Sequence, residues 1–124
     1  MDYIRDLIRD IPDFPKKGIM FKDITPVLSD IKALRLSIDE MTKPYVNQNI
    51  DVVVGIESRG FIFGTPMADK LNAAFVPIRK PGKLPWKTQK VQYQLEYGTD
   101  SLEIHTDAIN EGDNVLIVDD LLAT

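Results

Sequence analysis

The sequence predicts an α/β domain in which helices cover a parallel sheet. Three short runs rich in β-branched residues support this fold, because buried strands of parallel sheets have such a composition. They lie at 51–56 (DVVVGI), 74–79 (AFVPIR) and 114–119 (NVLIVD). Of the 124 residues, 44% are apolar and 27% are charged, so we expect one globular domain.

Two helices are expected around the first of these runs. At 31–46 the apolar residues recur at close to helical spacing, and Ser29 or Asp30 is the candidate N-cap. The second helix is expected at 61–71. Pro66 would be tolerated there only near the first turn, because proline lacks the backbone N–H that a helix interior uses.

The remaining segments predict a hairpin and an uncovered strand. Segments 91–97 and 101–105 flank a turn at 98–100 (GTD), which indicates a β-hairpin. The run 114–119 is the most strand-like of all, yet only five residues follow it. A central parallel strand needs cover on both faces. We therefore expect either that the natural chain continues past Thr124 or that another element shields this strand.

Composition excludes several kinds of protein. The absence of cysteine excludes disulfides, thiolate metal sites and a cysteine nucleophile, and a single histidine excludes a multi-histidine zinc centre. No apolar run is long enough to span a membrane, and the N-terminus lacks a signal-peptide pattern, so we expect a cytoplasmic protein without a membrane partner. The net charge of −4 argues against nucleic-acid binding.

Charged residues follow all three predicted strands. Ligands of parallel sheets gather at the carboxyl ends of the strands, so the loops at 57–60, 79–83 and 119–120 are expected to share one rim. Cations there suit phosphates, and carboxylates accept hydrogen bonds from hydroxyls. A basic strip that contains no acid extends from the second loop: Arg79, Lys80, Lys83, Lys87 and Lys90. This strip is either a solvated loop or a binding site for a polyanion.

Two of these loops have alternative interpretations. The turn at 56–61 directs backbone N–H groups and a helix N-terminus toward the rim, but every strand-to-helix connection does so. Arg59 within this turn adds a guanidinium that can grip phosphate oxygens in a bidentate manner. The pair Asp119 and Asp120 could instead cap a following helix. The same string also begins receiver domains, but those need about a hundred residues after the pair.

Four strings resemble one family. The segment 115–124 (VLIVDDLLAT) resembles the first ten positions of the phosphoribosyl-pyrophosphate (PRPP) signature of type I phosphoribosyltransferases. The strings DFPKKGIMFKDITPVL, ESRGFIFG and IRKPGKL with LEYG are similar to those of the adenine phosphoribosyltransferases in that family. The resemblance implies a hood at 1–30, a core at 31–83 and 106–124, a hairpin lid at 84–105, and a C-terminal part of the fold that is missing.

The resemblance also implies a reaction and its site. The family transfers a 5-phosphoribosyl group from PRPP to adenine, giving AMP and pyrophosphate, with Mg²⁺ held mainly through the substrate rather than by direct protein ligands. Asp119 and Asp120 would meet the ribose hydroxyls. Pyrophosphate would lie against two segments, the first containing a cis Glu57–Ser58 peptide. These segments and the start of the 5′-phosphate loop comprise Glu57, Ser58, Arg59, Gly60, Arg79, Lys80, Lys83, Ala123 and Thr124.

The purine site is implied at two further places. Phe21 would stack on adenine, and unpaired peptide groups from Ile19 through Met20 to Lys22 would read its polar edge; spacing alone favours a core aromatic at Phe21. Glu96 would handle the purine proton, with Tyr97 beside it, although a hairpin glutamate is ordinarily a surface charge. Glu96 and Arg59 are thus the candidate catalytic residues.

Three further expectations complete the resemblance. The family generally forms homodimers. Its signature continues past Thr124 with two glycines that help to bind the 5′-phosphate, so we expect residues 1–124 alone to be inactive. The alternative function is a regulatory protein that binds PRPP on the same fold without catalysis. His105 is expected to be structural, and Trp86 is assigned no chemistry.

Overall fold

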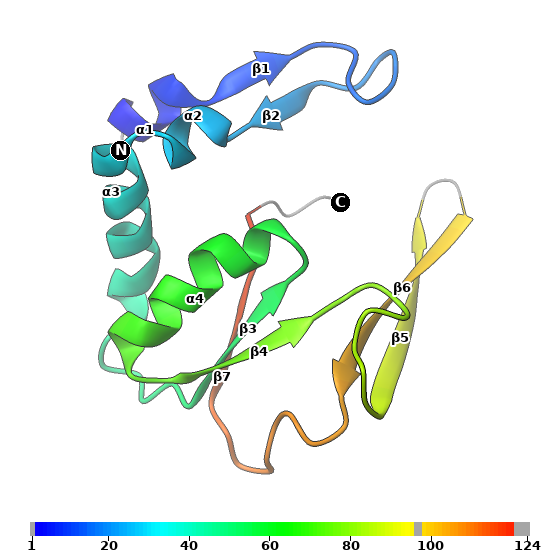
Figure 1. The fold of residues 1–124 in the computed structure, drawn as a ribbon. Coiled ribbons are helices and arrows are strands. Elements are labelled where there is room, and N and C mark those ends of the chain that lie inside the picture. Colours follow the sequence, from blue (N-terminus) through cyan, green and yellow to red (C-terminus); the bar gives the residue numbers. More distant parts are fainter. Residues whose placement is uncertain (1, 96–97, 121–124) are drawn as a thin grey trace. The chain divides into compact units, whose positions relative to one another are not determined.

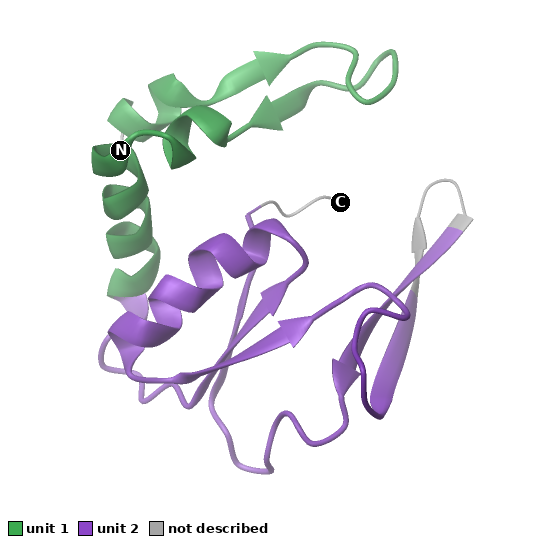
Figure 2. Ribbon diagram, in the orientation of Figure 1, with its two compact units in different colours: residues 1–43 green, residues 44–124 purple. Residues whose placement is uncertain are grey.

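The computed structural model describes residues 2–95 and 98–120. The chain divides into two compact units, residues 1–43 and 44–124 (Figure 2). The first holds α1 (Asp2–Leu7), β1 (Arg9–Ile11), β2 (Phe21–Asp23), α2 (Thr25–Leu28) and α3 (Ile31–Thr42). The second holds β3 (Val52–Ile56), α4 (Arg59–Leu71), β4 (Ala74–Ile78), β5 (Thr88–Leu95), β6 (Gly98–His105) and β7 (Val115–Val118), and the 3₁₀ turn η1 (Lys43–Tyr45) lies at the boundary.

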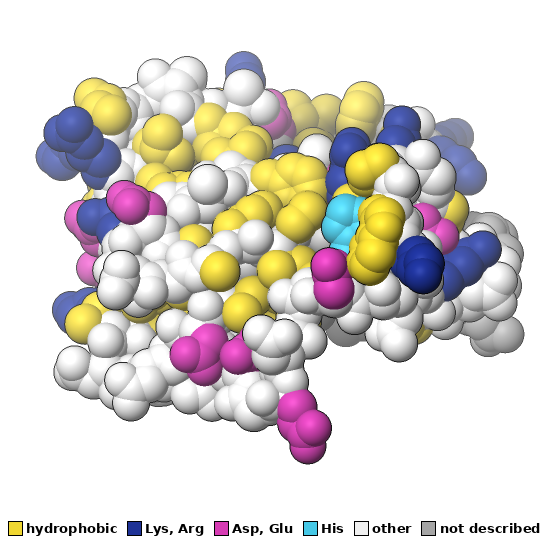
Figure 3. Space-filling view, turned by 60° about the horizontal axis from the view of Figure 1, so that its bottom comes forward, with side chains coloured by type: hydrophobic (Ala, Val, Ile, Leu, Met, Phe, Trp, Pro, Cys, Tyr) yellow, Lys and Arg dark blue, Asp and Glu magenta, His cyan; other side chains and the backbone are white. Residues whose placement is uncertain are grey.

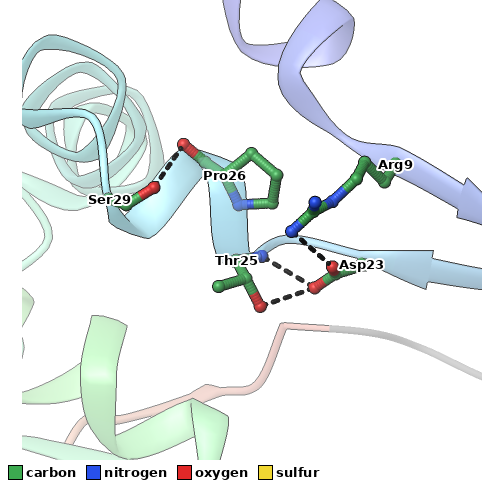
Figure 4. A network of polar contacts seen from close by, with 5 residues as sticks. All are labelled: Arg9, Asp23, Thr25, Pro26 and Ser29. Atoms are coloured by element: carbon green, nitrogen blue, oxygen red, sulfur yellow. Dashed lines mark hydrogen bonds and ion pairs between the residues drawn. The ribbon is translucent and has the colours of Figure 1, made fainter.

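The first unit is organised by capping interactions at Asp23 and Asp30. The strands β1 and β2 pair antiparallel, and Asp23 at the end of β2 accepts hydrogen bonds from the Thr25 hydroxyl and amide (Figure 4). These bonds and an ion pair with Arg9 at 3.2 Å hold the pKa of Asp23 below its ordinary value. Asp30 caps α3, as predicted, by accepting the Ala33 N–H at 3.0 Å.

The helix α3 confirms the prediction at its start and is shorter than expected at its end. It begins at Ile31 and ends at Thr42, where the sequence pattern extends to Val46. Pro44 explains the difference, because a proline cannot donate to the helix and disfavours the helical conformation of the residue before it. The chain continues in the short turn η1 instead.

The three predicted parallel strands form one sheet. Its order is β4-β3-β7, all pairs are parallel, and β3 is the central strand (Figure 1). The three valines 52–54 of β3 are buried, which explains a continuous apolar run in a strand covered on both faces. The strand β7 lies at the edge of this sheet, so the expectation that it is central is wrong for the described residues. Its Ile117 is 63% exposed, whereas Val118 is buried.

The helix α4 packs against this sheet (Figure 1). Its side chains Phe63, Met67 and Ala68 are buried. It begins at Arg59, two residues before the predicted start, so Pro66 lies inside the helix and not near its first turn. The expectation for Pro66 is therefore wrong. Pro66 cannot donate a hydrogen bond to the carbonyl of Ile62, a residue that is 40% exposed.

The predicted hairpin forms, but residues 98–100 are part of a strand and not its turn. The strands β5 and β6 are antiparallel and pair Tyr93 with Asp100 and Leu95 with Gly98. Residues 98–100 therefore belong to β6, and the prediction of a turn there is wrong because cross-strand pairing outweighs the local turn preference of Gly98. His105 at the end of β6 packs edge-to-face on Trp86, with ring centroids 6.3 Å apart. In Figure 3 this single histidine lies beside hydrophobic side chains.

None of the helices among the described residues is both long enough and apolar enough to cross a lipid bilayer.

Candidate active site at the carboxyl end of the sheet

The three predicted loops meet at one end of the sheet. The register aligns Ile56 with Ile78 and Gly55 with Val118, so the chains leave β3, β4 and β7 at the same level. A cavity of about 370 Å³ opens at this rim, within the size range of small-molecule sites. It is lined by Glu57, Ser58, Arg59, Lys80, Asp119 and Asp120. The expectation that these loops share one rim is confirmed.

Glu57 organises the cationic side of the cavity. Its Oε1 accepts the Arg79 Nε–H at 3.0 Å and the Lys80 backbone N–H at 3.1 Å, and its own N–H donates to Ile78. The Lys80 amide and then the Arg79 guanidinium keep the pKa of Glu57 below its ordinary value. The Glu57 carboxylate is therefore ionised at neutral pH and holds the beginning of the second loop against the first.

Arg59 and Asp120 link the first and third loops. The Arg59 Nε lies 2.9 Å from Asp120 Oδ2, and the Asp120 side chain is only 7% exposed. Gly60 permits this contact, because a Cβ at this position would lie 2.6 Å from the Val118 carbonyl oxygen. Only glycine allows β7 and the start of α4 to approach so closely.

Asp119 is the more exposed member of the acidic pair. Its Oδ1 accepts the Asp120 backbone N–H at 2.8 Å. The pKa of Asp119 is raised, first because its carboxyl group is partly desolvated and second because the Asp120 carboxyl group lies next to it. The Asp119 carboxylate can therefore accept hydrogen bonds from ligand hydroxyls. Desolvation and the neighbouring Asp120 make its ionised form less favourable than that of an ordinary aspartate.

The beginning of α4 supplies donors to the same cavity. Ser58 is the N-cap residue, but its side chain makes no capping hydrogen bond, and the Phe61 N–H bonds to the Ser58 carbonyl at 3.1 Å. The other amides of the first helical turn have no intrahelical acceptor, so a bound anion can accept hydrogen bonds from them. The Glu57–Ser58 peptide is cis, as the resemblance implies.

Two predicted residues lie near the cavity without lining it. Arg79 lies behind Glu57, where its guanidinium orients the carboxylate. Lys83 closes the turn of the second loop through a bond from its N–H to the Lys80 carbonyl at 3.3 Å.

The predicted purine-binding residues belong to the first unit. Phe21 packs edge-to-face on Phe14, with centroids 5.1 Å apart, and Lys22 pairs with Asp10. The Ile19 N–H and carbonyl both bond within their own loop, so the expectation of unpaired peptide groups is wrong for Ile19.

The remaining predicted residues lie outside the described residues. They are Glu96, Tyr97, Ala123 and Thr124.

Sequence reasoning missed Glu103. This half-buried residue of β6 accepts the Gly82 N–H at 3.1 Å through its Oε1, and its backbone pairs with Arg79. No local pattern reveals this contact, because it depends on how β6 lies against the end of β4. A charged residue in the middle of a strand was the only available signal.

The arrangement combines three binding functions in one cavity. Lys80 and the first turn of α4 can bind an anion, Asp119 can accept hydroxyl groups, and Arg59 connects the two sides through Asp120. A ligand that carries both phosphates and neighbouring hydroxyls satisfies all of them, as the sequence indicates.

The comparisons with known proteins agree with this fold. A protein-family model described as "Phosphoribosyl transferase domain" matches residues 20–124. The chain therefore belongs to the phosphoribosyltransferase family, and it has the type I fold expected from its sequence.

Its relatives within that family are adenine phosphoribosyltransferases. The enzyme of Rhodopirellula baltica is 61% identical over 121 residues, covering 98% of this chain and 59% of the relative. The crystal structure of the Thermoanaerobacter pseudethanolicus enzyme is 58% identical with a TM-score of 0.95, covering 99% of this chain and 72% of that one. The Saccharomyces cerevisiae enzyme, complexed with an imino-altritol bisphosphate and adenine, is 40% identical with a TM-score of 0.89, covering 96% and 70%. The chain thus spans between 59% and 72% of the length of these relatives.

Proposed function

We propose that this chain carries the site of an adenine phosphoribosyltransferase. The reaction joins N9 of adenine to C1′ of PRPP, breaks the bond from C1′ to the pyrophosphate oxygen, and releases the N9 proton. The observation that carries the proposal is the convergence of Arg59, Lys80 and Asp119 on one cavity. The relatives named above support the choice of reaction.

The acidic pair would hold the sugar. Asp119 has its carboxylate at the rim, where it can accept hydrogen bonds from the ribose hydroxyls. Asp120 is engaged by Arg59 at 2.9 Å, so it contributes chiefly by fixing the guanidinium beside the sugar. As positive charge develops on the ribose in the transition state, the nearby carboxylates stabilise it electrostatically.

The opposite side of the cavity would hold the departing pyrophosphate. Lys80 and the amides of the first turn of α4 present positive charge where negative charge develops. Lys83 lies at the other end of the turn that begins at Lys80, and it adds a second ammonium group. This arrangement lowers the barrier without a covalent nucleophile.

Magnesium fits this site as an ion bound mainly through substrate. Among the residues that the structure describes, no three side chains of the metal-binding types cluster together. Mg²⁺ favours oxygen ligands and commonly uses one or two carboxylates with substrate phosphates, so Asp119 and Asp120 are the candidate protein partners. When bound, the ion neutralises charge on the pyrophosphate.

The first unit would bind adenine. Phe21 offers an aromatic face for stacking, and Met20 and Lys22 flank it with their peptide groups. Adenine presents a donor at its 6-amino group and an acceptor at N1, whereas a 6-oxopurine reverses both. Glu96 is proposed to handle the N9 proton, with Tyr97 beside it. The adenine-bound yeast relative supports this choice of base.

The proposal also includes roles for Ala123 and Thr124 at the 5′-phosphate, a homodimeric state and a cytoplasmic location in purine salvage.

The decisive experiment is an assay with adenine, PRPP and Mg²⁺ of the chain extended through the two glycines with which the family signature continues. We expect AMP and pyrophosphate in equal amounts, and no nucleotide when hypoxanthine replaces adenine. In parallel, calorimetry measures the binding of PRPP to the same protein. Binding without AMP formation would favour the regulatory alternative, and neither binding nor AMP formation would overturn the proposed function.

A further inference from the structure

The second loop contains a tight turn that places two lysines side by side. The Lys83 N–H bonds to the Lys80 carbonyl at 3.3 Å, and Gly82 has a φ of 82°. Proline at the second position and a left-handed glycine at the third are typical of a type II turn. Its first and last Cα atoms lie within about 7 Å of each other. The Cα atoms of Lys80 and Lys83 are therefore close together, so both ammonium groups can contact one multiply charged anion.

One carboxylate holds the start of this turn. Glu57 accepts the Lys80 N–H at 3.1 Å and the Arg79 guanidinium at 3.0 Å. These contacts connect the turn to the loop after β3, but they reach only its first residue.

A second carboxylate, from a different element, holds the other side. The backbones of Glu103 and Arg79 exchange two hydrogen bonds, at 2.8 and 2.9 Å, which bring β6 alongside the end of β4. From this position Glu103 Oε1 accepts the Gly82 N–H at 3.1 Å. The turn is thus held between two carboxylates, Glu57 at its first residue and Glu103 at its third.

Glycine makes this second contact necessary. No atom beyond the neighbouring residues lies within 4 Å of the position that a Cβ of Gly82 would occupy, and glycine has access to many backbone conformations, so the Glu103 contact adds a restraint to the Lys83–Lys80 hydrogen bond that closes the turn. Without the Glu103 acceptor, Lys80 and Lys83 would sample separate positions and would have to be ordered again when an anion binds. That ordering weakens affinity.

We propose that Glu103 is a positioning residue for pyrophosphate: its carboxylate fixes the turn at Gly82 so that Lys80 and Lys83 face the anion together. This inference rests on the proposed function and deepens it. Glu103 acts through the turn, because its side chain is directed at a backbone amide.

Two substitutions separate the effect of the Glu103 side-chain length from the effect of its negative charge. E103Q keeps an oxygen acceptor at the same distance and removes the charge, whereas E103D keeps the charge and shortens the side chain by one methylene. E103A removes both, and E111A replaces an exposed glutamate in the loop between β6 and β7 as the matched control. Calorimetric titration with magnesium pyrophosphate measures affinity, and hydrogen exchange measures protection of the Gly82 amide.

We expect E103D and E103A to raise the Kd for pyrophosphate about tenfold and to lose protection at Gly82. E103Q and E111A should remain within about twofold of the parent chain. In assays of the extended chain, KM for PRPP should rise in E103D and E103A while KM for adenine does not. If E103A fails to fold, the comparison of E103D with E103Q decides.

Three results would overturn the proposal. If the parent binds pyrophosphate and E103D binds it equally well, Glu103 has no positioning role and the proposed function stands. If E103Q is as weak as E103D, the charge and not the acceptor matters. A parent chain that binds neither pyrophosphate nor PRPP would overturn the proposed function and this inference together.

Discussion

Gly60 is the position at which a single methyl group should damage both the fold and the site. An added Cβ would lie 2.6 Å from the Val118 carbonyl oxygen and 3.4 Å from the Asp119 Cα, both of them backbone atoms. Since neither is the end of a flexible side chain, G60A must displace the end of β7 or the start of α4. Overpacking of a buried position costs about 1–3 kcal/mol. Alanine's better helix propensity returns at most about 1 kcal/mol of this cost.

The assay for G60A has two readouts. Urea denaturation should show a free energy of unfolding lower by about 1–2 kcal/mol, after the propensity gain. PRPP binding should weaken more than stability alone explains, because the displaced backbone carries Asp120 away from Arg59. The control is D69A, at an exposed position of the same helix. A G60A chain that is as stable as the parent and binds PRPP normally would refute the claimed close approach.

Three further predictions concern the charged groups. D119N should raise Tm at pH 7, because the raised pKa of Asp119 means that its ionised form is disfavoured in the folded state; the gain should vanish as the pH falls below the ordinary Asp value, and PRPP binding should weaken. E57Q should lower stability by about 1 kcal/mol at neutral pH, an effect lost as the pH falls through the lowered pKa of Glu57; a constant difference down to pH 2 would contradict it. R59K should raise the Kd for PRPP about tenfold, because an ammonium cannot hold Asp120 and a phosphate in the same fork; unchanged affinity would argue against that role.

The strands and the shared rim were predictable from sequence because both follow from local composition and one topological rule. A continuous valine run such as 52–54 suits a strand buried on both faces, and loops that follow parallel strands meet at one edge. The residues that line the cavity at this edge were therefore identifiable from the sequence. The resemblance to a family added their expected roles.

The errors have physical reasons that local patterns do not contain. Gly98 has the composition of a turn, yet its pairing with Leu95 places it in β6. Pro66 lies inside α4 because the helix begins at Arg59, two residues before the start that the apolar pattern predicts. The three-residue strands β1 and β2 are too short to produce an alternating pattern.

Glu103 shows the limit most clearly. Its contact with Gly82 joins residues 21 positions apart in sequence and depends on the pairing of β6 with Arg79. A periodicity within one segment carries no information about such a contact.

A crystal structure of the chain with PRPP and Mg²⁺ tests the central claim most directly. The account predicts pyrophosphate oxygens against the first turn of α4 and Lys80, and ribose hydroxyls within hydrogen-bond distance of Asp119. PRPP bound on another face, with the cavity at the carboxyl end of β3 filled only by water, would contradict it.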